Sequence, residues 1–347
     1  MKKNIVAALA ASMLLACLMM TACGGSNQTE TPGITVEQTT ESATQESPSQ
    51  ETPSQEAPTQ ESLPISGDIV TLEDGTLILP DGHAIKPEYP INETAIGKAV
   101  TRFQYLYDSY LAGTDSAIHV AIIPDKGYYL QDTVPTLEYD KLFQLVQDGM
   151  PYASYIDLTD TLSLDAYYYT DIHWRQEYLW DAAARICQAL GVTAPAKEQF
   201  TETTLQMPFY GMYYEEGTAM GTDTILLLEN GMINGCTVTH HDTGRTTKVY
   251  DRSKMKSETL YDVFLSGATP LLTISNPKAA TDRELIIFRD SFGSSLVPLL
   301  LQDYASITLV DIRYVASGVI DQFVDFHGQD VLYLYSAHLI NNSSAMK

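Results

Sequence analysis

The sequence is short of basic residues, and this shortage narrows the functions that it can have. Its 347 residues include 20 Lys and Arg against 44 Asp and Glu, which gives a net charge of −24. A chain this acidic repels polyanions, so we expect no nucleic-acid partner. The charge does not identify a chemistry, because an acidic surface suits many proteins that work outside the cytoplasm.

Long apolar runs are also scarce, since only the N-terminal run approaches the length of a bilayer span. Two lysines precede the uncharged residues 5–20, and small residues then lead to Cys23. This order is typical of a secretory signal peptide over residues 1–22. The segment Met-Thr-Ala-Cys at its end resembles the lipobox of bacterial lipoproteins, which implies that Cys23 carries lipid such as palmitate. The alternative is an uncleaved signal anchor. We therefore expect an extracytoplasmic protein that is lipid-anchored to the cytoplasmic membrane.

Residues 24–64 lack Lys, Arg, Phe, Tyr and Trp altogether, and they are rich in Thr, Ser, Gln, Glu and Pro. Such a composition cannot build a core. A five-residue pattern that starts with Gln-Glu recurs three times from residue 45. We interpret residues 23–64 as a disordered linker with a reach of roughly 35 Å.

Cysteine is the next scarce residue, with four in the whole chain. Cys17 falls in the predicted signal peptide and Cys23 is the predicted lipid site, which leaves Cys187 and Cys236. A disulfide between these two is one alternative outside the cytoplasm. The other is a pair of free thiols, and it is favoured because Cys187 falls on the apolar face of a predicted helix.

The remaining residues, 65–347, are long enough for one large domain or two small ones, and we favour one. Short apolar runs alternate with helical patterns, which predicts an α/β fold with parallel strands. Between residues 209 and 250 the pattern changes to β-type runs, which predicts a β-rich insertion. The predicted strands cover 119–123, 155–158, 285–288, 307–310 and 331–335, and the predicted helices cover 95–111, 137–146, 174–190, 292–301 and 319–326.

A candidate nucleophile, Ser291, follows a predicted buried strand and precedes a predicted helix. The carboxyl ends of parallel strands are where α/β proteins bind ligands, and amides at a helix start can stabilise an oxyanion. The alternative is that Asp290 or Ser291 only caps the helix.

A second cluster contains Asp171 and His173, directly before the helix predicted from Trp174. Residues two apart in an extended segment point the same way, and a turn in a loop before the helix is the alternative geometry; in either case the carboxylate can orient the imidazole. The other ring nitrogen is then free to accept the proton of a serine hydroxyl. The alternative is a helix-capping Asp171 and a packed core His173.

Taken together, Asp-x-His followed by Asp-Ser-Phe-Gly resembles the DHHW family of bacterial exported proteins. That family is similar to the SGNH hydrolases and is related to the periplasmic O-acetyltransferases that acetylate alginate. The resemblance implies a three-layer SGNH or flavodoxin-like domain with a mainly parallel sheet, in which Asp171, His173 and Ser291 are catalytic. Further matching segments are Ile123-Pro124-Asp125-Lys126, Phe209-Tyr210-Gly211, Tyr213-Tyr214 and Val310-Asp311-Ile312-Arg313-Tyr314.

The chain departs from the family motif at one position, because Ile172 stands where the family has its first histidine. The resemblance implies that the catalytic pair is retained and that the contacts with the substrate can be altered. The Gly and Asn that donate to the oxyanion in SGNH enzymes have no secure counterpart. Gly211 and Asn276 are candidates, and each is also explained as a turn residue.

Three residues are candidate substrate-binding groups: Arg289, Tyr210 and Lys126. Arg289 can equally pair with an acidic neighbour, and tyrosines that suit stacking on sugar rings also fill protein cores. His240 and His241 do not predict a metal site, because neighbours on a strand face opposite ways. We expect neither a metal nor a cofactor.

These observations predict a serine O-acetyltransferase or esterase that acts on a cell-surface or exported polysaccharide. The alternative is a catalytically idle module that binds a polysaccharide or a partner protein of a cell-envelope assembly. An enzyme requires Ser291 within reach of His173 and a pocket alongside, whereas an idle module tolerates their separation.

Overall fold

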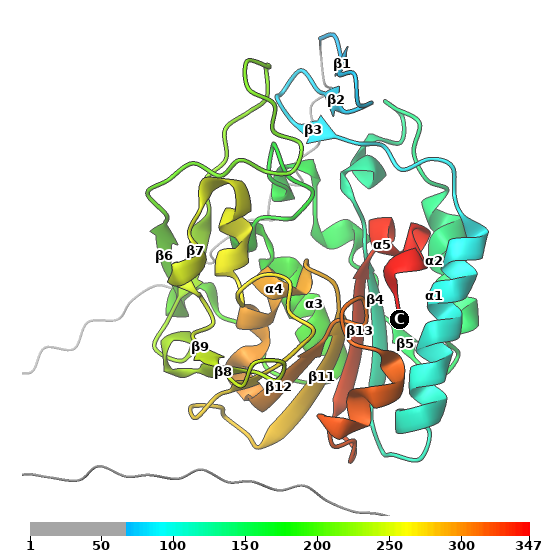
Figure 1. Cartoon of the computed structure of the whole chain (residues 1–347), viewed down its shortest axis with the longest axis vertical. Coiled ribbons are helices and arrows are strands. Elements are labelled where there is room, and N and C mark those ends of the chain that lie inside the picture. The colour runs from blue at the N-terminus through cyan, green and yellow to red at the C-terminus, as the bar shows by residue number, and fades with distance from the viewer. Residues whose placement is uncertain (1–66) are drawn as a thin grey trace, which may run out of the picture. The chain divides into compact units, whose positions relative to one another are not determined.

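The computed structural model describes residues 67–347, so the predicted signal peptide, Cys23 and the linker lie outside the described residues. An eight-stranded sheet has the order β5-β4-β13-β11-β12-β10-β8-β9 (Figure 1). The strands from β5 to β12 in this order pair in parallel, and β10, β8 and β9 continue antiparallel. The strands are β4 Ile118–Ile123, β5 Ser154–Tyr155, β8 Thr237–His240, β9 Thr246–Thr247, β10 Leu271–Ser275, β11 Arg283–Arg289, β12 Tyr304–Val310 and β13 Asp330–Ser336.

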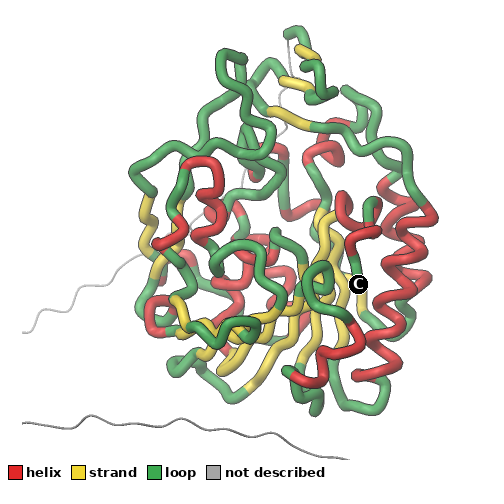
Figure 2. The backbone as a smooth tube through the Cα atoms, viewed as in Figure 1, coloured by secondary structure: helices red, strands yellow, loops and turns green. Residues whose placement is uncertain are grey.

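Helices cover both faces of this sheet (Figure 2), and the side chains of β4 alternate between the two resulting cores. Val120 and Ile122 pack in one core with α1, α2 and α5, whereas Ala121 and Ile123 pack in the other with α3 and α4. The mainly parallel α/β fold predicted from the sequence is confirmed. The helices are α1 Glu93–Leu106, α2 Tyr139–Gly149, α3 Trp180–Leu190, α4 Gly293–Leu296 and α5 Ala337–Asn341.

Two small sheets lie beside the main one. One is three-stranded, with β1 Val70–Thr71, β2 Leu77–Ile78 and β3 Ala84–Ile85, and the other pairs β6 Thr201–Thr204 with β7 Leu226–Glu229. The predicted β-rich region therefore divides between two sheets. β7 belongs to a small sheet, whereas β8 and β9 extend the main sheet through β10, a strand that the sequence did not predict.

The helix predicted from Trp174 begins only at Trp180, and this expectation was wrong by six residues. Trp174 pairs as a β-bridge with Tyr167, and its indole nitrogen donates to the carbonyl of Phe292 at 3.0 Å. Gln176 is also fully buried, and its side chain bonds to the backbone of Ser295 and Leu228. These contacts with distant segments hold the chain out of the helix, because tertiary contacts override local propensity.

The carboxyl ends of three adjacent parallel strands meet at one edge of the sheet. β4 leads into Asp125, β13 leads into α5, and β11 leads into Ser291. This is the edge at which α/β sheets bind ligands. The fold therefore brings the candidate nucleophile to the same edge as the strand-end motif that contains Lys126.

Both remaining cysteines are buried free thiols, so the favoured alternative holds and no disulfide joins them. Burial raises the pKa of Cys187 to about 12 and that of Cys236 to about 11, which keeps both thiols protonated. No helix within residues 67–347 is long and apolar enough to cross a membrane.

Candidate active site

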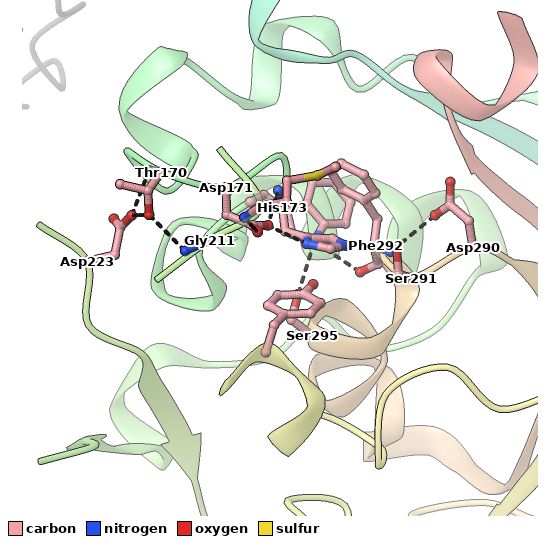
Figure 3. Close-up of polar contacts among 12 residues, drawn as sticks. Thr170, Asp171, His173, Gly211, Asp223, Asp290, Ser291, Phe292 and Ser295 are labelled. Carbon is pink, nitrogen blue, oxygen red and sulfur yellow. Dashed lines mark hydrogen bonds and ion pairs between the residues drawn. The ribbon is translucent and has the colours of Figure 1, made fainter. Parts of the chain in front are cut away.

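Asp290 shapes the turn that carries Ser291. Its Oδ1 accepts the amide of Phe292 at 3.1 Å, and its Oδ2 accepts the amide and the hydroxyl of Ser336 at 2.9 and 2.7 Å. Asp290 thus closes a turn just before α4, whose N-cap residue Phe292 has no side-chain cap hydrogen bond, so the helix-capping alternative holds for neither Asp290 nor Ser291. The hydroxyl of Ser291 is released for other contacts (Figure 3).

Asp223 holds the loop on which Asp171 lies. Its carboxylate accepts the amide of Tyr169 at 2.9 Å, the amide of Thr170 at 2.7 Å and the hydroxyl of Thr170 at 2.6 Å (Figure 3). A carboxylate with several donors fixes both segments that it joins. The position of Asp171 is therefore set by a residue more than fifty positions away.

Asp171 is a buried carboxylate with three hydrogen-bond donors around it. Oδ1 accepts from the amide of His173 at 3.0 Å and pairs with His173 Nδ1 at 2.6 Å, and Oδ2 accepts the amide of Met212 at 2.9 Å. Burial alone would raise the pKa of Asp171, but the neighbouring His173 and these hydrogen bonds lower it to about 2. The carboxylate is ionised at neutral pH and orients the imidazole.

His173 joins the two halves of the site. Its Nε2 lies 2.7 Å from Ser291 Oγ, which completes a continuous chain from Asp171 to Ser291 (Figure 3). Tyr261 stacks on the imidazole, with ring centroids 3.9 Å apart and an angle of 12° between the planes. The side chain of His173 keeps 14% of its surface exposed, so a substrate can reach it. The two clusters predicted from the sequence are brought together.

The oxyanion donors differ from those expected. The amides of Phe292 and Gly293 already donate to the Oδ1 and the carbonyl of Asp290, so these amides at the start of α4 are not free. Within residues 67–347 the amide of Ser291 itself has no acceptor. It is therefore the backbone donor that remains for an oxyanion beside Ser291.

Neither Asn276 nor Gly211, the two candidates from the sequence, is placed to donate a hydrogen bond to the oxyanion. Asn276 follows β10 at the amino edge of β12, opposite to the edge of Ser291, and its amide donates to Leu301 and Tyr304 carbonyls. The amide of Gly211 donates to the hydroxyl of Thr170 at 3.1 Å. The alternative that each is a turn residue therefore holds for both.

The three candidate substrate-binding residues lie in different surroundings. Arg289 is 1% exposed and donates to the carbonyl of Asp290 and the hydroxyl of Ser294, so it contacts neither a substrate nor a carboxylate partner. The expectation that Arg289 binds the substrate is therefore wrong. Lys126 is buried beside a small pocket, and Tyr210 is half-buried with its ring 4.4 Å from that of Tyr214.

Sequence reasoning missed Asp223, Tyr261 and Ser336, which support the loop of Asp171, the ring of His173 and the turn of Ser291. Each comes from a segment far from the motif that it supports. No local spacing signals such a role. Among the described residues no group of three or more His, Cys, Asp or Glu side chains could hold a metal ion.

Comparison with solved structures finds this architecture in a DHHW family protein from Eubacterium siraeum. The TM-score is 0.63 and the sequence identity 19%, over 81% of this chain and 97% of that one. This chain has the DHHW fold. Two structures of PatB1 from Bacillus cereus, one of them with a sulfonyl adduct, match with TM-scores of 0.58 and 0.59 and identities of 18% and 17%. They cover 79% of this chain and 97% and 96% of theirs.

No family model matches the sequence, and no curated protein matches it. The resemblance to the DHHW family, which the sequence indicated from short motifs, is thus confirmed at the level of the fold. Within the DHHW fold, the departure at Ile172 falls next to the triad and not in it. Ile172 lines the same small pocket as Lys126.

Gly211 provides a test of the loop that supports Asp171. A Cβ at this position would lie 2.4 Å from the Asp171 Cβ and 2.4 Å from the Thr170 carbonyl oxygen. We expect Gly211→Ala to lower the free energy of unfolding by about 1–3 kcal/mol, because backbone and side chain must both shift. Urea unfolding measures the change.

Gly97 is the matched control. It lies on the exposed side of α1, and a Cβ there meets nothing within 4 Å. Gly97→Ala is expected to raise the free energy of unfolding by about 0.5–1 kcal/mol, because Ala favours helix over Gly. Equal and small effects at both positions would contradict the tight packing described for Gly211.

Proposed function

We propose that this protein is an extracytoplasmic serine enzyme that transfers or hydrolyses O-acetyl groups on a cell-surface or exported polysaccharide. One observation carries the proposal: the unbroken chain of contacts of 2.6 and 2.7 Å from Asp171 through His173 to Ser291. Its position at the carboxyl edge of a parallel sheet, with 14% of the imidazole side chain exposed, suits catalysis on a bound substrate.

In the first half of the reaction, Ser291 Oγ attacks the acyl carbonyl and His173 Nε2 takes the hydroxyl proton. The carbonyl oxygen becomes an oxyanion, which the Ser291 amide can stabilise. Asp171 stabilises the imidazolium through Nδ1. His173 then returns the proton to the departing alcohol, the bond from the carbonyl carbon to that alcohol breaks, and an acyl-serine remains.

In the second half, an acceptor hydroxyl attacks the acyl-serine. His173 removes the acceptor proton, a new ester bond forms, and the bond to Ser291 Oγ breaks as the serine regains a proton from His173. Water as the acceptor gives hydrolysis, and a sugar hydroxyl gives transfer. The same residues serve both outcomes.

The triad geometry supports an enzyme over the catalytically idle binding module. An idle site does not need the close contact between Ser291 and His173, nor the separate supports that fix each of them. The replacement of the first motif histidine by Ile172, which kept the idle module as an alternative, lies outside the chain of contacts from Asp171 to Ser291.

The substrate class and the location rest on the sequence. The motifs resemble those of exported proteins related to alginate O-acetyltransferases, which suggests a polysaccharide. The proposed signal peptide and lipid on Cys23 suggest attachment to the outer side of the cytoplasmic membrane, with the acidic linker as a spacer. Proteins of a cell-envelope assembly are the proposed partners.

The triad is tested with purified protein and p-nitrophenyl acetate. We expect Ser291→Ala and His173→Ala to lower kcat/KM about a thousandfold or more, and Asp171→Asn to lower it by a comparable factor, because the three residues act as a unit. Release of nitrophenol is followed by absorbance.

Exposed residues of the same types provide the controls. Ser344→Ala, His327→Ala and Asp132→Asn change side chains away from the site and are expected to retain full activity. Circular dichroism checks that every variant is folded. Equal activity in wild type and Ser291→Ala would contradict the proposed function.

The anchor is tested in cells that produce the full chain. We expect wild-type protein to incorporate labelled palmitate and to sediment with membranes, whereas Cys23→Ser incorporates none, because only the lipobox thiol accepts the lipid. Cys187→Ser is the control, since that thiol is buried in the fold. Label retained in Cys23→Ser would overturn the lipoprotein assignment.

A further inference from the structure

Residues 210–214 form a turn that lies against the loop of Asp171. The amide of Gly211 donates to the hydroxyl of Thr170 at 3.1 Å (Figure 3), and the amide of Met212 donates to Asp171 Oδ2 at 2.9 Å. Consecutive Cα atoms are about 3.8 Å apart, so the residues on either side of this pair also lie close to Asp171. The backbone of the turn is thus fixed directly to the carboxylate of the triad.

The start of the turn is tied to the helix that carries Tyr261. The amide of Tyr210 donates to the carbonyl of Ser257 at 3.0 Å, and Ser257 is the first residue of the 3₁₀ helix Ser257–Val263. Tyr261 in this helix stacks on the imidazole of His173. The turn is therefore bonded to both segments that hold the imidazole, so it borders the active site.

Two tyrosine rings lie together at the surface of this turn. Tyr214 is 41% exposed and Tyr210 is half-buried, and their ring centroids are 4.4 Å apart with an angle of 30° between the planes. Met212, between them in the sequence, is 66% exposed. We call Tyr210 and Tyr214 the tyrosine platform. Because the backbone beneath it is fixed, little order has to be gained when a ligand binds.

The chemistry of the tyrosine platform suits a sugar ring. The C–H groups on one face of a pyranose pack against an aromatic ring, and the tyrosine hydroxyls at its edge can bond to sugar hydroxyls. A polysaccharide carries several rings in succession. The rings on either side of the reacting one therefore contact protein surface beyond the triad, and the platform provides such a surface next to Asp171.

The charge of the protein favours a neutral polymer over an anionic one. Glu215 and Glu216, both exposed, directly follow Tyr214, and the whole chain has a net charge of −24. Lys254 and Lys256, just before the supporting helix, offset only a part of this charge. A polyanion is repelled by such a protein, whereas a neutral saccharide is not.

We propose that Tyr210 and Tyr214 stack against a sugar ring of a neutral polysaccharide, next to the sugar whose ester or hydroxyl reacts at Ser291. This inference rests on the proposed function and deepens it, because it names the charge class of the substrate and a surface that binds it. The platform does not contact the reacting atoms. Both tyrosines are therefore substrate-binding residues and not catalytic ones.

Affinity electrophoresis of the purified full chain tests the platform. The protein migrates in native gels that contain deacetylated glucomannan, xyloglucan or mixed-linkage β-glucan, or polygalacturonate as the anionic polymer. Because these polymers carry no acetyl ester, retardation relative to serum albumin measures binding alone. We expect retardation by at least one of the three neutral polymers and none by polygalacturonate.

Substitutions in the platform separate stacking from folding. Tyr214→Ala and Tyr210→Leu are each expected to weaken the binding about tenfold because a ring is lost, whereas Tyr214→Phe keeps the ring and binds within about twofold of wild type. Tyr105→Ala is the matched control, since Tyr105 is also 41% exposed but lies on α1. It is expected to bind as wild type does. Thermal unfolding shows that each variant is folded.

The outcomes separate this inference from the proposed function. Absence of retardation by all three neutral polymers overturns the inference, and so does equal or stronger retardation by polygalacturonate. Equal binding by wild type and by folded Tyr214→Ala and Tyr210→Leu also overturns it. Hydrolysis of p-nitrophenyl acetate that does not depend on Ser291 overturns the proposed function instead, and retardation would then point to the polysaccharide-binding module.

Discussion

The site depends on one buried carboxylate that is not itself in the triad. Asp290 accepts three hydrogen bonds, one from the turn that carries Ser291 and two from Ser336 at the end of the neighbouring strand β13. Because a buried charge is stable only when it is fully paired, these bonds fix the turn to the sheet. Ser291 is left free of any capping role, and its hydroxyl faces His173.

The opposite half of the site is held in the same manner by Asp223, which accepts three donors from the segment that precedes Asp171. The two halves are 118 residues apart in sequence and meet through the hydrogen bond between His173 and Ser291. Tyr261 keeps the imidazole in its plane. Such independent support is what preorganises a catalytic group, since little remains to be reordered when charge develops.

The main strands and the triad residues could be predicted from the sequence, because they depend on patterns of residues close together in the chain. The buried strands at 118–123 and 283–289 contain the apolar runs from which they were predicted, and the residues of the triad stand in recognisable motifs. The predictions that were wrong concern residues whose positions depend on contacts with distant parts of the chain. The helix expected from Trp174 starts late because its indole bonds to the Ser291 turn, and Arg289 is buried where a substrate contact was expected. Asn276 lies at the wrong edge because β10 runs antiparallel.

The central claim is that Ser291 is a nucleophile activated by His173, and an aryl sulfonyl fluoride tests it most directly. PatB1, which shares the fold, has been solved with a sulfonyl adduct. After incubation with the reagent, the intact protein is weighed and its peptides are sequenced by mass spectrometry. The account predicts one sulfonyl group on Ser291 in wild type and none in folded His173→Ala. Equal labelling of Ser291 in both proteins, or labelling only at other hydroxyls, would contradict it.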